Sequence, residues 1–176
     1  MVTKLRAEFL NINTPPHIFT LIVLSGLGAL SLSIFLSSIL EMSVFFNKSY
    51  ALMQLSISLY LITTAFFQII AGPLSDKFGR RIITLFSIMI FIIASLGCFF
   101  STKFEFFIFF RLLQASIAAG FLMSRVIIRD ITSENEAASM IGYVTMGMSI
   151  IPLFAPGLGG LIQMLLGWPS IFLIMS

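Results

Sequence analysis

Long stretches without a charged side chain dominate this sequence of 176 residues. No Asp, Glu, Lys or Arg occurs in residues 9–40, 49–75, 82–102 or 137–176. Each stretch has room for the roughly 20 apolar residues with which a helix crosses a bilayer. Only 10% of the residues are charged, whereas a typical soluble domain carries about 25%. The sequence therefore predicts an all-α integral membrane protein whose main partner is the lipid bilayer.

The charged residues separate five predicted spans, which follow an N-terminal segment of residues 1–17. We place these spans at residues 18–40, 50–73, 82–101, 106–127 and 138–166. Gly167, Trp168 and Pro169 then interrupt the apolar pattern. The remaining segment, 169–176, would cover about 12 Å of a bilayer core about 30 Å thick. We therefore expect the transmembrane region, 18–176, to end within a sixth helix that is cut short.

The distribution of Lys and Arg predicts the orientation, because these residues concentrate in cytoplasmic loops. An N-terminus inside the cell would place on the cytoplasmic side Lys4, Arg6, Lys77, Arg80, Arg81 and Arg129. Only Lys48 and Lys103 would then lie in outer loops. We expect a multi-pass protein of the inner (plasma) membrane with a cytoplasmic N-terminus. The net charge of +3 is too small and too dispersed for a nucleic-acid-binding face.

The turn between the second and third predicted spans has the most distinctive pattern, Gly-Pro-Leu-Ser-Asp-Lys-Phe-Gly-Arg-Arg at residues 72–81. We expect Gly72 to admit close helix packing and Gly79 to allow a tight turn. Pro73 would bend the end of span two, and Asp76 would cap the N-terminus of span three or complement its positive end. A basic cytoplasmic turn explains part of this pattern. It does not explain the ordered spacing of two glycines, one acid and three bases.

Arg111 lies about 9 Å into the fourth predicted span if that helix begins near Glu105. A buried Arg costs at least about 2.5 kcal/mol in a membrane, so we expect Arg111 to face a cavity or a partner. Gln114 is one turn away. The alternative is an Arg that snorkels to the outer interface. Arg125, near the inner end of the same span, is equally consistent with a topology anchor and with a cavity residue.

No carboxylate falls inside a predicted span, although proton coupling needs a group whose pKa crosses the working pH. The acids all lie at span ends or in loops: Glu8, Glu41, Asp76, Glu105, Asp130, Glu134 and Glu136. Cys98 is the single cysteine, and we interpret it as a small buried apolar residue. The spans show no metal-ligand spacing and no nucleophile beside a base. The sequence thus predicts no cofactor, no metal site and no intramembrane enzyme.

Three motifs in order resemble the major facilitator superfamily. Residues 72–81 resemble its signature loop between helices two and three. Residues 111–114 (Arg-Leu-Leu-Gln) resemble its fourth-helix motif, although Ala115 replaces the usual Gly. Residues 155–160 (Ala-Pro-Gly-Leu-Gly-Gly) resemble the Gly-Pro-x-x-Gly-Gly motif of drug antiporters, with Ala for the first Gly.

The segments 125–130 and 168–172 are further similar to the Bcr/CflA group of drug-resistance transporters. The resemblance covers residues 20–176 and implies the N-terminal six-helix half of a fold whose two halves rock around a central cavity. It implies efflux of small apolar or amphipathic, drug-like molecules together with a second half. That half would be another polypeptide or a second copy of this chain. The alternatives are a remnant that does not transport and a module that only binds another membrane protein.

The resemblance also implies roles for particular residues. The signature loop would steady the outward-facing state through Gly72, Asp76, Lys77, Gly79, Arg80 and Arg81, with Arg80 paired to Asp130. Transport and coupling would involve Arg111, Gln114 and Arg125. Packing or gating of the fifth helix would involve Pro152, Pro156, Gly157, Gly159 and Gly160. One departure is clear: Ser33 stands where the Bcr/CflA group carries a helix-one Asp, and Ser37 stands where it carries a Pro.

Overall fold

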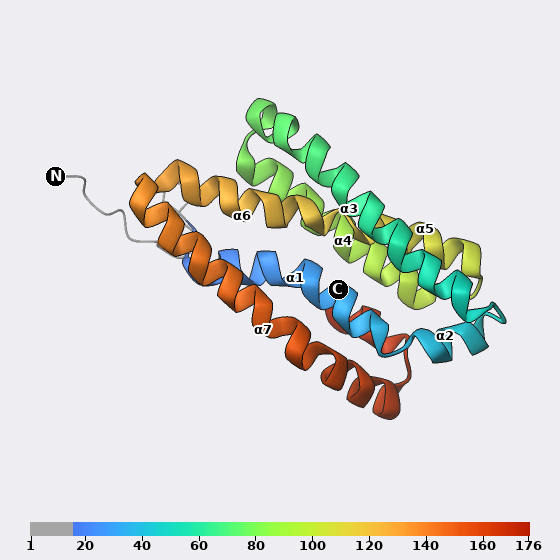
Figure 1. Ribbon diagram of the computed structural model, residues 1–176. Helices are drawn as coiled ribbons and strands as arrows, with labels where there is room; N and C mark the ends of the chain where they lie inside the picture. The colour runs from blue at the N-terminus through green and yellow to red at the C-terminus, as the bar shows by residue number, and fades with distance from the viewer. Residues whose placement is uncertain (1–15) are drawn as a thin grey trace.

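The computed structural model describes residues 16–176, without the side chain of Asn135, and this part of the chain is helical (Figure 1). Its helices are α1 (Ile18–Leu36), α2 (Ile39–Phe45), α3 (Tyr50–Phe78), α4 (Arg80–Phe100), α5 (Phe104–Gln114), α6 (Ile117–Ile131), α7 (Glu134–Leu166) and α8 (Ser170–Met175). Most of the expected N-terminal segment, 1–17, lies outside the described residues.

Five helical stretches in the described residues are long and apolar enough to cross a membrane. They are α1, α3, α4, the combined stretch of α5 and α6, and most of α7. The prediction of an all-α integral membrane protein is confirmed. The segment after Pro169 forms the six-residue helix α8.

Two of the expected spans are interrupted in the structure. The first breaks at Ser37 and Ser38, between α1 and α2, and the fourth breaks at Ala115 and Ser116, between α5 and α6. At both breaks backbone N–H groups bond three residues back rather than four, as in Ala115 N to Leu112 O at 3.1 Å. Such tightened turns inside a helix often mark a functional bend.

Several helices run further than the expected spans, among them α3, α6 and α7, because polar residues extend them beyond the apolar stretch. α3 continues five residues past Pro73 and ends where Gly79 adopts a φ of +94°, a conformation that suits glycine. α7 begins at Glu134, and the acids in its first turn favour the positive end of the helix dipole. The pattern 72–81 is thus mostly the last turns of α3, followed by one glycine.

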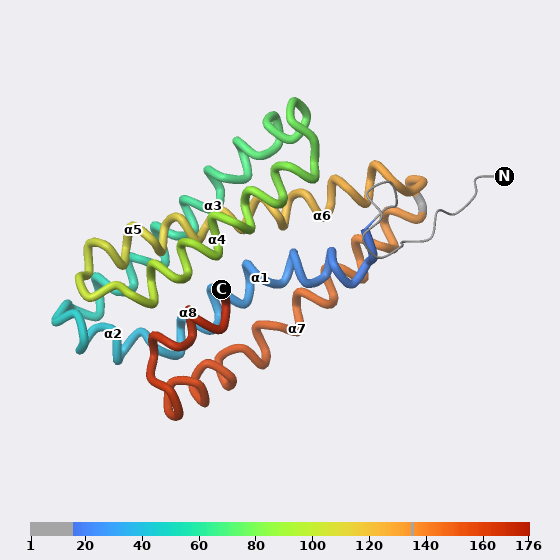
Figure 2. Tube along the Cα trace, turned by 180° about the vertical axis from the view of Figure 1, so that it is seen from behind, coloured from blue at the N-terminus to red at the C-terminus, as the bar shows by residue number. Residues whose placement is uncertain are grey.

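Helix α1 runs between α6 and α7, and α7 lies alongside it over most of its length (Figure 1). Glycines allow this close approach. A Cβ added at Gly159 would lie 3.0 Å from the backbone oxygen of Ile34, and one added at Gly147 would lie 2.7 Å from Ile22. The chain turns back after α7, and α8 packs against α4. Figure 2 shows α8 in front of α1.

The expected close packing at other glycines does not occur within the described residues. Nothing lies within 4 Å of a Cβ added at Gly72, Gly157 or Gly160. Pro152 and Pro156 are exposed on α7. The positions on α7 among these face away from the described bundle, so their part in gating stays a prediction.

Candidate functional site

Arg111 is the largest fully buried side chain of the described residues, with 0% of its surface exposed. It lies on α5, two turns from the start of that helix. Its Nη1 donates to the Ser31 hydroxyl at 2.8 Å and to the Gln114 amide oxygen at 2.5 Å. Its Nη2 donates to the Ser31 backbone oxygen at 3.0 Å. The expectation that Arg111 faces a partner is confirmed, and the snorkelling alternative is wrong.

Aromatic rings cover the guanidinium of Arg111. Its central carbon lies 4.4 Å from the ring centroid of Phe35 and 4.4 Å from that of Tyr60. A cation over an aromatic face is attracted by the negative face of the ring, and this attraction grows when water is absent. Phe35 and Tyr60 are themselves buried. The two rings therefore stabilise the charge in place of solvent.

Gln114 extends the arrangement, because its amide nitrogen donates to the Ser95 hydroxyl at 2.6 Å. Gln114 and Arg111 are three residues apart and so project from the same face of α5. We call this group the Arg111 cluster: Ser31 and Phe35 of α1, Tyr60 of α3, Ser95 of α4, and Arg111 and Gln114 of α5. It joins the first four candidate spans at one buried charge.

No carboxylate of the described residues bonds to Arg111; its partners are neutral. Two buried polar atoms of the cluster have no hydrogen-bond partner among the described residues, namely Arg111 Nε and the Tyr60 hydroxyl. Ser33, where the resembled group carries an acid, is buried but is not among the hydrogen-bond partners of Arg111. Arg111 instead contacts α1 at Ser31, two residues before Ser33.

A second arginine, Arg80, forms an exposed ionic cluster at the α3–α4 turn. Its Nε donates to Asp130 of α6 at 3.2 Å, and its Nη1 contacts Asp76 and the Ser75 hydroxyl of α3. The expected pair of Arg80 with Asp130 is confirmed. Of the two roles expected for Asp76, capping of α4 is wrong, since the N-cap of α4 is Gly79 and no side chain caps it; the complementing of its positive end stays a prediction. Asp76 lies in the last turn of α3 and binds Arg80 instead.

The remaining predicted residues do not join either cluster. Lys77 and Arg81 are exposed, and the Lys77 amine lies 5.4 Å from the Phe78 ring centroid. Arg125, half-buried on α6, stacks on Phe121 of the same helix at 4.3 Å. Gly159 packs against α1, as described above.

Sequence reasoning missed Ser31, Phe35, Tyr60 and Ser95. A usable signal existed for Ser31 and Ser95, because a hydroxyl inside an apolar span tends to bond to a neighbouring helix. Tyr60 joins the cluster through its ring instead of its hydroxyl. Nothing in the spacing showed which hydroxyl faces Arg111, since many serines occur in these spans. Phe35 carried no signal, as the sequence has 20 phenylalanines.

The family model described as Major Facilitator Superfamily matches residues 18–176. The chain belongs to the Major Facilitator Superfamily. This is a family of transporters, so the chain is a transporter-family protein rather than an enzyme. The match covers the Arg111 cluster and the Arg80 cluster together.

Among similar proteins of this superfamily is YdgK, an uncharacterized MFS-type transporter of Bacillus subtilis (strain 168). It is 34% identical over 157 residues, which are 88% of this chain and 39% of YdgK. A chloramphenicol resistance protein of Pseudomonas aeruginosa is 32% identical over 83% of this chain and 35% of its own length. Multidrug resistance protein D of Escherichia coli (strain K12) is 27% identical over 88% and 40%, respectively. The chain thus spans well under half the length of these relatives.

Proposed function

We propose that this major facilitator chain forms the N-terminal half of a Bcr/CflA-type exporter that moves small drug-like molecules by alternating access. Relatives named for chloramphenicol and multidrug resistance support the substrate class. The second half would be supplied by further sequence, by another polypeptide or by a second copy. The N-terminus would face the cytoplasm of a cell whose inner membrane holds the protein, in line with the distribution of Lys and Arg.

The Arg111 cluster is the observation that carries this proposal. A charge held by neutral partners in a low-dielectric interior keeps a long-range field that no described counter-ion cancels. Its energy therefore depends on any charge that enters the neighbouring space, whether on a substrate or on an acid elsewhere in the transporter. The Arg111 guanidinium contacts α1, and its partner Gln114 contacts α4. A change in the electrostatic energy of Arg111 would therefore alter the packing of several spans together. This is the property that a coupling residue needs.

The Arg80 cluster would serve the conformational cycle in a different way. Arg80 links the end of α3, the start of α4 and the end of α6 through ion pairs that solvent reaches. Exposed pairs of this kind form and break at low cost. We propose that they hold these helix ends together as one unit while the half moves.

The test is drug or dye efflux from cells that express the protein. Replacement of Arg111 by Ala removes the buried charge, and we expect it to lower efflux at least about tenfold, as loss of one or more charge-assisted hydrogen bonds would. Arg129→Ala, which removes an exposed Arg of α6, is the matched control and should keep efflux near the unmodified level. The amount of protein in the membrane is measured for both variants.

Unchanged efflux in Arg111→Ala would remove the coupling role from this residue. Efflux no higher in cells with the unmodified protein than in cells without it would contradict the proposed export.

A further inference from the structure

The charge of Arg111 has no counter-ion in the helices that surround it. An arginine stays protonated in a protein, and no Asp or Glu occurs in residues 9–40, 49–75 or 82–102, which form most of α1, α3 and α4. Oxygen atoms of neutral groups and two aromatic rings are its partners among the described residues. A buried charge without a counter-ion is costly. The Arg111 cluster therefore favours the entry of an anion.

Two hydrogen-bond donors beside this charge are unused. Arg111 Nε and the Tyr60 hydroxyl are buried and have no hydrogen-bond partner within the part of the chain that the structure describes. The central guanidinium carbon lies 4.4 Å from the Tyr60 ring centroid. Because Nε is bonded to that carbon and the hydroxyl to that ring, the two atoms are near neighbours. Native proteins rarely leave buried donors without a partner, so we expect a small acceptor beside both.

We propose that Arg111 and Tyr60 together bind one small inorganic anion, such as chloride. The anion accepts hydrogen bonds from Arg111 Nε and from the Tyr60 hydroxyl, and it supplies the missing counter-charge. A water molecule would accept the same bonds but would leave the charge unbalanced. Burial keeps the ligand small, since Arg111 is 0% and Tyr60 2% exposed. This binding needs neither a second half nor a transport cycle, so it does not rest on the proposed export.

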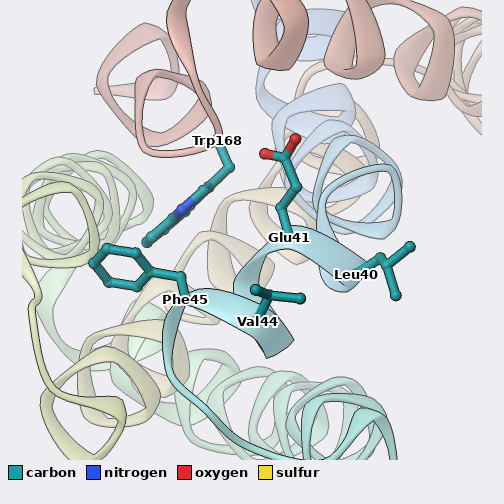
Figure 3. A pocket seen from close by; sticks show the side chains of 5 residues that line it. All are labelled: Leu40, Glu41, Val44, Phe45 and Trp168. Carbon is teal, nitrogen blue, oxygen red and sulfur yellow. The ribbon is translucent and has the colours of Figure 1, made fainter.

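A pocket beside α2 is less suited to an anion. Its lining residues are Leu40, Glu41, Val44, Phe45 and Trp168 (Figure 3). Glu41 is the one charged side chain among them, and Figure 3 shows its carboxylate beside Trp168. This carboxylate repels a negative ligand. An anion that binds the chain therefore favours the Arg111 cluster over this pocket.

The test is heat unfolding of the purified chain in non-ionic detergent, while chloride replaces gluconate at constant ionic strength. Trp168 is the single tryptophan, and its ring packs on Phe45 and Phe107, so its fluorescence reports unfolding. Gluconate is too bulky for the enclosed site. A ligand that binds only the folded chain raises the unfolding temperature. We expect a rise of about 3 °C when chloride is tenfold above its dissociation constant.

Tyr60→Phe removes one of the two donors and keeps the ring over Arg111. We expect this variant to need about five- to tenfold more chloride for the same rise, although in gluconate alone it should unfold at or slightly above the temperature of the unmodified chain. The matched control Tyr143→Phe, at an exposed position of α7, should respond as the unmodified chain does. Elution at the same volume in gel filtration checks that both variants fold.

Three results would overturn the proposal. One is the same unfolding temperature of the unmodified chain in chloride and in gluconate. The second is a chloride requirement that Tyr60→Phe leaves unchanged. The third is an equal increase of that requirement in Tyr60→Phe and Tyr143→Phe, which would place the effect of chloride away from Arg111. Failure of efflux in cells would leave this binding untouched, since the purified chain alone is measured.

Discussion

Arg111 and Arg80 are the same kind of side chain in opposite surroundings. Arg111 is fully buried and is held by hydroxyl, amide and aromatic groups. Arg80 lies at the α3–α4 turn, is partly exposed, and has two carboxylate partners. Water and acids stabilise the second charge, whereas only dipoles and ring faces of the described residues stabilise the first.

This difference separates two ways of using one charge. Screening by water and salt makes the Arg80 pairs weak and easily exchanged, which suits contacts that form and break. A desolvated charge loses much of its favourable energy if one partner leaves, which makes every contact of Arg111 matter. We therefore expect the loss of one contact to destabilise the Arg111 cluster strongly, and the ion pairs of Arg80 to form and break easily.

The largest expected effect comes from Gln114→Leu. This change removes the acceptor for Arg111 Nη1 and the donor to Ser95 while keeping similar bulk. A buried charge would lose one of its hydrogen bonds, and we expect the free energy of unfolding to fall by about 2–3 kcal/mol. It is measured by denaturant titration in mixed micelles. Gln54→Leu, at an exposed position of α3, is the control and should change it by less than about 0.5 kcal/mol. Equal losses of stability in Gln114→Leu and Gln54→Leu would contradict the special sensitivity of the Arg111 cluster.

A smaller effect is expected when one ring leaves the Arg111 cluster. Tyr60→Leu removes a cation–π face, and we expect the free energy of unfolding to fall by about 1–2 kcal/mol. Tyr60→Phe keeps the ring and removes a buried hydroxyl that lacks a described partner, so it should be neutral or slightly stabilising. The same titration serves for both. A loss in Tyr60→Phe as large as in Tyr60→Leu would show that the hydroxyl, rather than the ring, does the stabilising.

The smallest effect is expected at the exposed cluster. Asp130→Asn removes one carboxylate partner of Arg80, but Asp76 and solvent remain. We expect a loss of stability smaller than that of either change above, and one that disappears at about 1 M salt, where charges are screened beyond about 3 Å. Unfolding is compared at low and high salt. A loss that persists at high salt would mean that the Arg80 cluster is as shielded from water as Arg111.

The sequence predicted the membrane fold and the special position of Arg111 from one principle, since charged residues are costly in lipid. Arg80 stood out through the ordered pattern of residues 72–81. The Arg80–Asp130 pair followed from the resemblance. The partners of Arg111 did not follow, because Ser31, Tyr60 and Ser95 look like many other polar residues of these spans, and helix rotation decides which of them face inward. The breaks after Leu36 and Gln114 were also missed. Neither Gly nor Pro stands at these breaks; instead, one serine at each bonds to a neighbouring helix, Ser38 to Gln163 at 2.6 Å and Ser116 to the Ser87 carbonyl at 3.1 Å.

The burial of Arg111 is the claim on which this comparison depends, and arginine modification measures it directly. The folded chain in non-ionic detergent is treated with phenylglyoxal, and each arginine is followed by mass spectrometry. Exposed Arg129 should react quickly, whereas Arg111 should stay unmodified until the protein is unfolded. Modification of Arg111 at the rate of Arg129 in the folded chain would contradict a guanidinium enclosed by four spans.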